Sequence, residues 1–116
     1  MYTKEQLLVS LGFRSIWNVR LIVGDVCKTI PQYCKENRSF NLSFLHLDLD
    51  YYEPTLIALK YFYPRLSARG VIMFDDYNMY QGETQAVDEY FRKRVSVQKD
   101  DLYGLHFIIK ERAERC

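Results

Sequence analysis

Glycine and cysteine are both scarce in this 116-residue chain. Its five glycines are scattered and form no glycine-rich cluster. Its three cysteines, Cys27, Cys34 and Cys116, are an odd number and lack the paired spacing that zinc ligands show. Free thiols in a reducing compartment are the simpler interpretation, so we expect a cytoplasmic protein.

An excess of charge and long apolar runs are also missing. The 16 basic and 15 acidic residues leave a net charge of +1. A protein that binds nucleic acid normally carries a clear basic surplus, so we expect no nucleic-acid partner. Every apolar run is interrupted by charged residues before it could span a bilayer, and the amino-terminal stretch has no signal-peptide core. We therefore expect no membrane partner.

The composition that is present fits an ordinary globular domain. Hydrophobic residues make up 48% of the chain and charged residues 27%. The length allows one domain with a modest core, and no internal repeat or linker divides it. We therefore expect a single unit over residues 1–116.

Short apolar runs alternate with amphipathic segments along the chain, which predicts an α/β fold with a mostly parallel sheet. The predicted strands are Val19–Val23, Leu42–Leu49, Val71–Phe74, Val95–Val97 and Leu105–Ile109. The predicted helices are Lys4–Phe13, Ile30–Lys35 with Pro31 in its first turn, a helix that opens at Glu53 and Pro54 and stops at Pro64, and Glu83–Lys93. The clearest strand, Leu42–Leu49, is apolar on both faces, which is typical of a strand buried in a parallel sheet.

Acidic residues follow two of these strands. Asp48 and Asp50 stand at the carboxyl end of one, and Asp75 and Asp76 follow the next along the chain. Parallel strands would bring all four carboxylates to the sheet edge where α/β proteins bind ligands. Because four close carboxylates repel one another, they indicate a hard divalent cation such as Mg²⁺ or Ca²⁺. The alternative is that these residues only start turns, which Asp favours.

Several other residues have two open interpretations. Asp25 follows a predicted strand and is either a further site residue or a helix cap. His46 lies within a strand, where a hydrogen-bonded core histidine is the simpler interpretation than a catalytic base. The tyrosines near the acids either line a substrate pocket or pack over the sheet edge: Tyr51, Tyr52, Tyr77 and Tyr80.

The motifs around these acids resemble those of the macrocin O-methyltransferase family, of the TylF type. The run LHLDLDYYEPT contains an LDxD motif at a strand end, and YPRL, a glycine, a strand that ends in DDY, and AVDEY follow in order. Upstream, VRLIVGDVCKTIP is similar to the family's strand and loop at that place. The resemblance extends from about Thr3 to Ile109. It implies a Rossmann-like class I fold and S-adenosylmethionine-dependent methylation of a hydroxyl on a sugar, a sugar nucleotide or a related natural product.

The resemblance also implies roles for single residues. Asp48, Asp75 and Asp76 match the acids that hold Mg²⁺ in the family. Asp50 matches the second acid of the LDxD motif, as either a metal ligand or the base that accepts the hydroxyl proton. Asp25 matches a position that often lies near the adenine of the cofactor.

The chain departs from the family pattern in one respect. Class I methyltransferases hold the cofactor with a glycine-rich loop after the first strand and an acid after the second, and neither is present here. We therefore expect a partial domain without the amino-terminal cofactor-binding strands. It is either a fragment or truncated gene product, or a chain that forms a homo-oligomer or a complex with a separate amino-terminal half. Two rival hypotheses are a non-catalytic remnant or subunit of the same fold, and an unrelated module that binds a divalent cation or a sugar.

Overall fold

The computed structural model describes residues 18–75 and 77–111, together with the single positions 3, 6, 9, 10 and 12. The helix predicted for Lys4–Phe13 lies mostly outside the described residues. None of the described helices is long and apolar enough to cross a bilayer. The elements are α2 (Val26–Glu36), β1 (Leu42–Leu47), α3 (Tyr52–Phe62), the 3₁₀ turn η1 (Tyr63–Arg65), β2 (Leu66–Phe74), α4 (Gln81–Phe91), β3 (Gln98–Lys99) and β4 (His106–Ile109).

The four strands form one sheet in the order β1-β2-β4-β3. β1 and β2 are parallel, and β4 is antiparallel to both β2 and β3. Three of the four strands therefore run in the same direction, with β4 reversed between β2 and β3. The predicted α/β fold with a mostly parallel sheet is confirmed.

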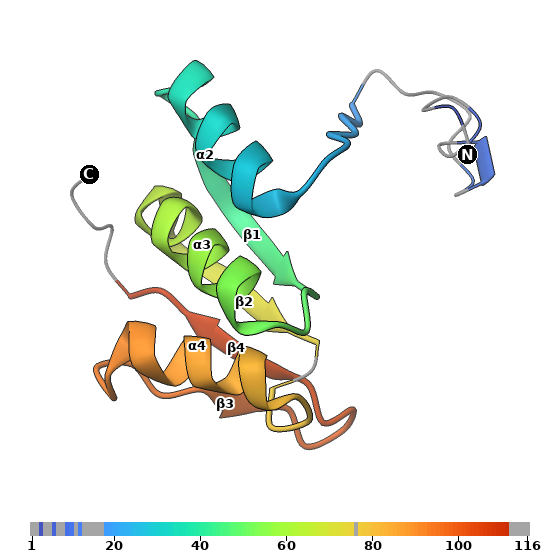
Figure 1. The fold of residues 1–116 in the computed structure, drawn as a ribbon. Helices are drawn as coiled ribbons and strands as arrows, with labels where there is room; N and C mark the ends of the chain where they lie inside the picture. The colour runs from blue at the N-terminus through green and yellow to red at the C-terminus, as the bar shows by residue number, and fades with distance from the viewer. Residues whose placement is uncertain are drawn as a thin grey trace.

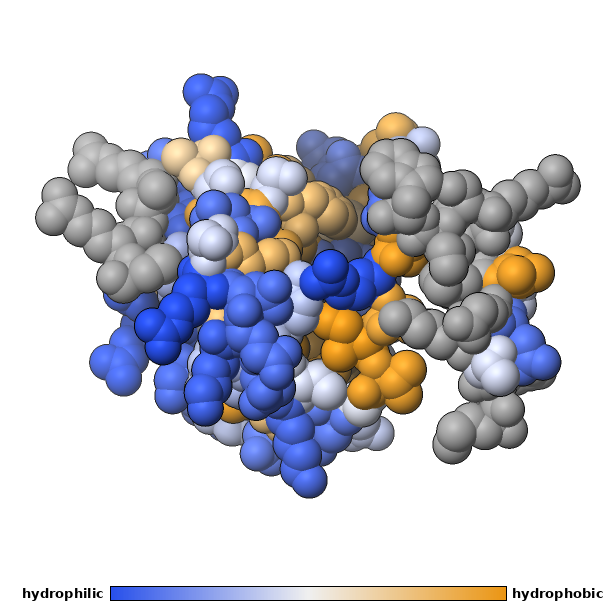
Figure 2. All heavy atoms as spheres, turned by 90° about the horizontal axis from the view of Figure 1, so that it is seen from above, coloured by the Kyte–Doolittle hydropathy of each residue, from blue (hydrophilic) through white to orange (hydrophobic). Residues whose placement is uncertain are grey.

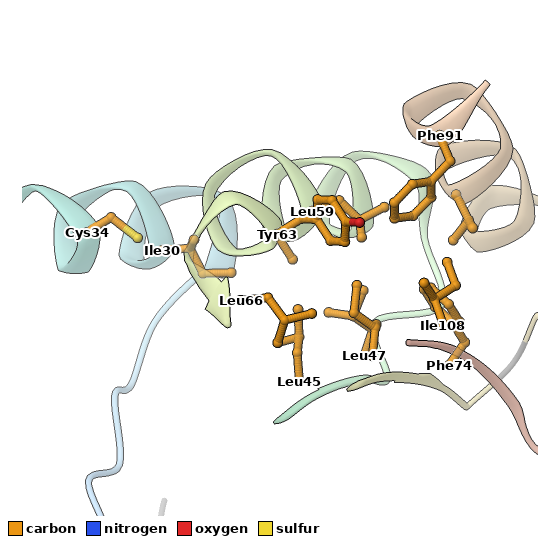
Figure 3. Packing of buried hydrophobic residues seen from close by; sticks show 13 residues of the cluster. Ile30, Cys34, Leu45, Leu47, Leu59, Tyr63, Leu66, Phe74, Phe91 and Ile108 are labelled. Atoms are coloured by element: carbon orange, nitrogen blue, oxygen red, sulfur yellow. The ribbon is translucent and has the colours of Figure 1, made fainter. Parts of the chain in front are cut away.

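The three helices α2, α3 and α4 lie side by side over one face of this sheet (Figure 1). Side chains alternate between the faces of a strand, so every second residue of each strand points toward the helices. These residues are buried: Leu45, Leu47, Ile72, Phe74 and Ile108. Figure 3 shows Leu45, Leu47, Phe74 and Ile108 facing α3 and its neighbours. The core is thus a single layer between helices and sheet.

The opposite face of the sheet is not covered by any element that the structure describes. Phe44, Val71 and Ile109 are neighbours across three strands on this face, and Phe44 and Ile109 are 53% and 43% exposed. In the view from above, which does not look onto this face of the sheet, hydrophobic residues also reach the surface as a patch among hydrophilic ones (Figure 2). The prediction that both faces of the strand at Leu42–Leu49 are buried is therefore wrong for the described part of the chain.

Two of the predicted strands are absent. Val19–Val23 and Val95–Val97 form no strand, and the short β3 follows directly after the second of these runs. A β-branched run becomes a strand only where a neighbour accepts its backbone hydrogen bonds, and no described strand lies beside Val19–Val23. Without a neighbouring strand, the side chains of Ile22 and Val23 stay exposed.

The helix expected at Ile30–Lys35 begins four residues earlier, at Val26. The Asp25 carboxylate accepts a hydrogen bond from the Cys27 backbone N–H at 3.0 Å, which fixes this start. Pro31 consequently lies inside α2 and not in its first turn.

Gly70, predicted to turn the chain into the strand at Val71–Phe74, lies within β2. β2 begins earlier, at Leu66, which already pairs with Leu42 of β1. The register then shifts before Phe44 pairs with Val71, and Arg69 in this stretch has a left-handed φ of 66°. The expected turn is thus a bulge in a longer strand. Leu105–Ile109 is confirmed as β4 apart from its first residue, and Pro64 does lie just past the end of α3, in η1.

Candidate functional site at the carboxyl edge of the sheet

Asp48 and Asp75 lie next to each other at the carboxyl edge of the sheet. Asp48 directly follows β1, and Asp75 directly follows β2. The Asp75 backbone N–H donates to the Leu47 carbonyl at 3.0 Å, so the parallel pairing continues past the end of both strands. Both acids are exposed. The structure therefore brings together one acid from each of the two strands, as the sequence pattern predicts.

Asp50 does not lie on a strand, so its side chain does not follow the alternation that a strand continuing to residue 50 would give. β1 ends at Leu47, and Asp50 adopts a left-handed backbone with φ of 64°. Its carboxylate is only partly buried, yet its Oδ1 is shielded from water and has no hydrogen-bond partner. A shielded carboxylate oxygen without a donor is costly unless a ligand or proton satisfies it. Strained backbone of this kind tends to occur at functional sites.

His46 belongs to the same group of residues. Its Nε2 lies 3.7 Å from the Asp75 Oδ1, and the two side chains are 40% and 46% exposed. The interpretation of His46 as a hydrogen-bonded core histidine is therefore wrong, because the side chain lies on the uncovered face of the sheet. Its imidazole can orient the Asp75 carboxylate from that side.

The remaining predicted residues separate into two cases. Asp76 lies outside the described residues, and within the part that the structure describes no group of three or more acidic, histidine or cysteine side chains could hold a metal ion. Asp25 is exposed and caps α2, which is one of its two predicted roles. Its role near the cofactor stays a prediction.

Two of the four tyrosines near the edge are hydrogen-bonded to α4. The Tyr52 hydroxyl donates to Glu89 Oε2 at 2.5 Å, and the Tyr77 hydroxyl donates to Asp88 Oδ1 at 2.8 Å. The bond from Tyr52 lowers the pKa of Glu89 and raises that of Tyr52. Burial and then the bond to Asp88 raise the pKa of Tyr77 to about 12.

These bonds fix α4 against the acidic edge. Gly82 makes this approach possible, because a Cβ at that position would lie 2.7 Å from the Tyr52 backbone nitrogen. Sequence reasoning missed Asp88 and Glu89. The signal that could have found them is their place on the polar side of the amphipathic helix that follows the DDY motif. Tyr51 and Tyr80 remain exposed, at 74% and 50%.

Comparison with known proteins identifies the family of this chain. Residues 15–104 match the macrocin O-methyltransferase (TylF) family, and this chain belongs to that family. It is 35% identical over 91 residues to the demethyldecarbamoylnovobiocin O-methyltransferase of Streptomyces niveus. This match covers 73% of this chain and 33% of that protein.

Two solved structures share the fold. CalS11, a TDP-rhamnose 3'-O-methyltransferase of calicheamicin biosynthesis, superimposes with a TM-score of 0.70 at 26% identity, over 77% of this chain and 40% of CalS11. The O-methyltransferase NovP superimposes with a TM-score of 0.55 at 31% identity, over 62% of this chain and 31% of NovP. The chain thus spans between about a third and two fifths of the length of these relatives.

Proposed function

We propose that this chain forms the acceptor-side part of a methyltransferase domain that transfers a methyl group from S-adenosylmethionine to a sugar or sugar-nucleotide hydroxyl. The observation that carries the proposal is that Asp48 and Asp75 occupy neighbouring positions at the carboxyl ends of two parallel strands. The chain also belongs to a family of O-methyltransferases. Ligands of open α/β sheets bind at this edge. One similar protein is named a demethyldecarbamoylnovobiocin O-methyltransferase, and another a TDP-rhamnose 3'-O-methyltransferase of calicheamicin biosynthesis.

The donor set at this edge suits Mg²⁺. Asp48 and Asp75 supply only carboxylate oxygens, and hard divalent cations prefer such ligands. By the resemblance, Asp76 would be the third ligand. A bound divalent cation would lower the pKa of a hydroxyl that contacts it.

The protein side chains would then orient the acceptor and move its proton. Asp50 is the proposed proton acceptor, because its shielded Oδ1 lacks a hydrogen-bond donor. His46 would keep the Asp75 carboxylate directed toward the edge. Positioning of this kind accounts for much of the acceleration in a displacement reaction.

The residues that the structure describes offer no site for S-adenosylmethionine. No glycine-rich cluster is present, and the carboxylate of Asp25, its only candidate contact, caps α2. We infer that residues outside this sequence would supply the cofactor site, either from the same protein if the chain is a fragment, or from another copy or a separate amino-terminal half. The free thiols Cys27 and Cys34 support a cytoplasmic location for the assembly.

The same observation supports a second candidate function. A chain with an acidic edge but without a cofactor site would serve as a non-catalytic subunit, or as a module that binds a divalent cation or a sugar. Failure to methylate any acceptor in the presence of a complementing amino-terminal half would favour this alternative.

The metal proposal is tested by thermal unfolding with and without Mg²⁺. We expect Mg²⁺ at about 100 times its Kd to stabilise the parent by about 2.7 kcal/mol, because a ligand that binds only the native state raises the unfolding free energy. The Asp75→Asn variant should lose most of this response. Asp101→Asn is the matched control, since Asp101 is an exposed acid in the turn between β3 and β4. An equal response in Asp75→Asn and the parent would place the cation elsewhere.

A further inference from the structure

A cleft of about 750 Å³ runs along α2 and reaches the end of α3 and η1. We call it the cationic cleft, because four basic side chains line it: Lys28, Lys35, Arg38 and Arg65. None of the described residues that line it is a carboxylate. A cleft of this volume has room for a small molecule.

The two arginines place one end of the cationic cleft at the edge of the sheet opposite the acids. Arg65 directly precedes β2, and Arg38 lies four residues before β1. Both therefore stand near the amino ends of two parallel strands, whereas Asp48 and Asp75 follow the carboxyl ends of the same strands. A small ligand at the arginines would not reach the acidic edge, so the cleft is separate from the proposed acceptor site.

The four basic side chains have no acidic partner to neutralise them. None forms a salt bridge among the residues that the structure describes. Lys28, Lys35 and Arg38 are exposed, and Arg65 is partly buried. The positive charge of the cleft is therefore available to a ligand from solution.

The field is strongest toward the carboxyl end of α2, because acids lie near its amino end. Partial burial and then the charges of Asp25 and Glu53 raise the pKa of the Cys27 thiol, which lines the cleft. The same two carboxylates offset the charge of Lys28 nearby. An anion is therefore attracted to the end that the two arginines occupy.

Arg65 presents hydrogen-bond donors that an anion would satisfy. Its Nη2 donates to the Cys34 carbonyl at 3.3 Å, which ties the guanidinium to α2. Its Nε is shielded from water and has no acceptor in the part of the chain that the structure describes. A shielded N–H without an acceptor is costly, and an oxyanion bound by the guanidinium would remove that cost.

The helix dipole does not explain this cluster of cations. It favours Lys35 in the last turn of α2 but disfavours Lys28 in the first turn. Arg65 lies outside α2 altogether, in η1. Two separate elements thus contribute cations to one cleft.

We propose that the cationic cleft binds a small anion that carries a phosphate group, at a site separate from that of the methyl acceptor. A phosphate group carries about two negative charges and offers several acceptor oxygens, which suit two guanidinium groups and an ammonium. The net charge of +1 argues against a nucleic acid as the source of the phosphate. The proposal goes beyond methyl transfer and does not depend on it.

Titration of the full chain with inorganic phosphate tests the proposal by amide chemical shifts, with acetate at equal ionic strength as the carboxylate probe. We expect saturable changes at Lys35, Arg38 and Arg65, and at least about tenfold weaker binding of acetate, which carries a single charge. Lys35→Gln with Arg38→Gln removes two exposed cations and should lower the phosphate affinity about tenfold. Arg65→Lys keeps the charge but loses the planar fork, and it should also weaken binding.

Lys93→Asn with Lys99→Gln is the matched control. It removes two exposed cations that do not line the cleft, and it leaves the same net charge as the double cleft variant. Asn also tolerates the left-handed backbone of Lys93. The affinity of this control should stay within about twofold of the parent.

Three results would overturn the proposal: no saturable change with phosphate, acetate binding as tight as phosphate binding, or an equal loss of affinity in the control and the cleft variants. Phosphate binding requires neither cofactor nor methyl acceptor. Its failure would therefore leave the proposed function standing, and failure of methyl transfer would leave the cleft assignment intact.

Discussion

The hydrogen bond from the Tyr77 hydroxyl to Asp88 should make the unfolding free energy depend on pH. The pKa of Tyr77 is raised to about 12 from an ordinary value near 10, first by burial and then by its bond to Asp88. Between these two values the folded protein keeps a proton that the unfolded chain loses. The stabilisation is therefore complete below about pH 10 and is lost as the pH rises to about 12.

Urea unfolding at pH 9 and at pH 11.5 measures this contribution. We expect the unfolding free energy of the parent to fall more steeply over this interval than that of Tyr77→Phe, which has no phenol to titrate. Tyr103→Phe removes an exposed tyrosine from a turn and should behave like the parent. Equal slopes for the parent and Tyr77→Phe would show that the hydrogen bond to Asp88 does not persist in solution.

Lys110 shows what a residue pattern cannot predict. It is 1% exposed, and its Nζ donates to the carbonyls of Tyr63 and Leu66 at 2.8 Å. The same nitrogen lies 4.6 Å from the centroid of the Tyr63 ring. A lysine just after an apolar strand is normally solvated, and only the tertiary fold brings the end of β4 beside η1.

At the scale of elements, the start of α2 depends on one side chain. Asp25→Ala removes the acceptor for the Cys27 N–H, and we expect it to lower the unfolding free energy by about 1 kcal/mol. Asp25→Asn should retain nearly all the stability, because asparagine caps helices as well as aspartate does. Urea unfolding of both variants distinguishes capping from a role of the carboxylate charge. A similar loss in both variants would mean that the negative charge itself stabilises the start of α2, as its interaction with the helix dipole predicts.

The elements that could be predicted from sequence are those with local signals. β1, β4 and the end of α3 follow from apolar runs and from Pro64. The strand expected at Val19–Val23 fails because pairing depends on distant segments, which a local pattern does not contain. The early start of α2 could have been predicted from Asp25, since an Asp immediately before the first helical residue is a typical N-cap.

The meeting of Asp48 and Asp75 at one edge of the sheet was predictable from the order of the strands and not from a local pattern. Two strand-end acids meet wherever two consecutive strands are parallel neighbours, and β1 and β2 are such a pair. The left-handed backbone of Asp50 and the position of His46 beside Asp75 were not predictable, because both depend on where β1 ends. The cationic cleft depends on α2 packing beside the end of α3, and no local pattern marks it.

At the scale of the whole molecule, the described sheet has an unpaired edge and an uncovered apolar face. β1 has only one neighbour, β2, so the backbone groups along its outer side have no partner strand. Phe44 and Ile109 are exposed on the uncovered face. Edges of this kind readily accept a further strand, and exposed apolar patches commonly mark interfaces.

We therefore expect the purified chain to form a dimer or a higher oligomer at low micromolar concentration, as measured by sedimentation velocity. Phe44→Glu places a charge on the uncovered face, where burial against a second copy would be costly, and should shift the population toward monomer. Tyr103→Glu is the matched control, because Tyr103 is likewise an exposed aromatic residue but lies in the turn before β4 and not in a strand. A compact parent monomer that unfolds cooperatively would contradict the expectation, because it would mean that the chain pairs and covers β1 by itself.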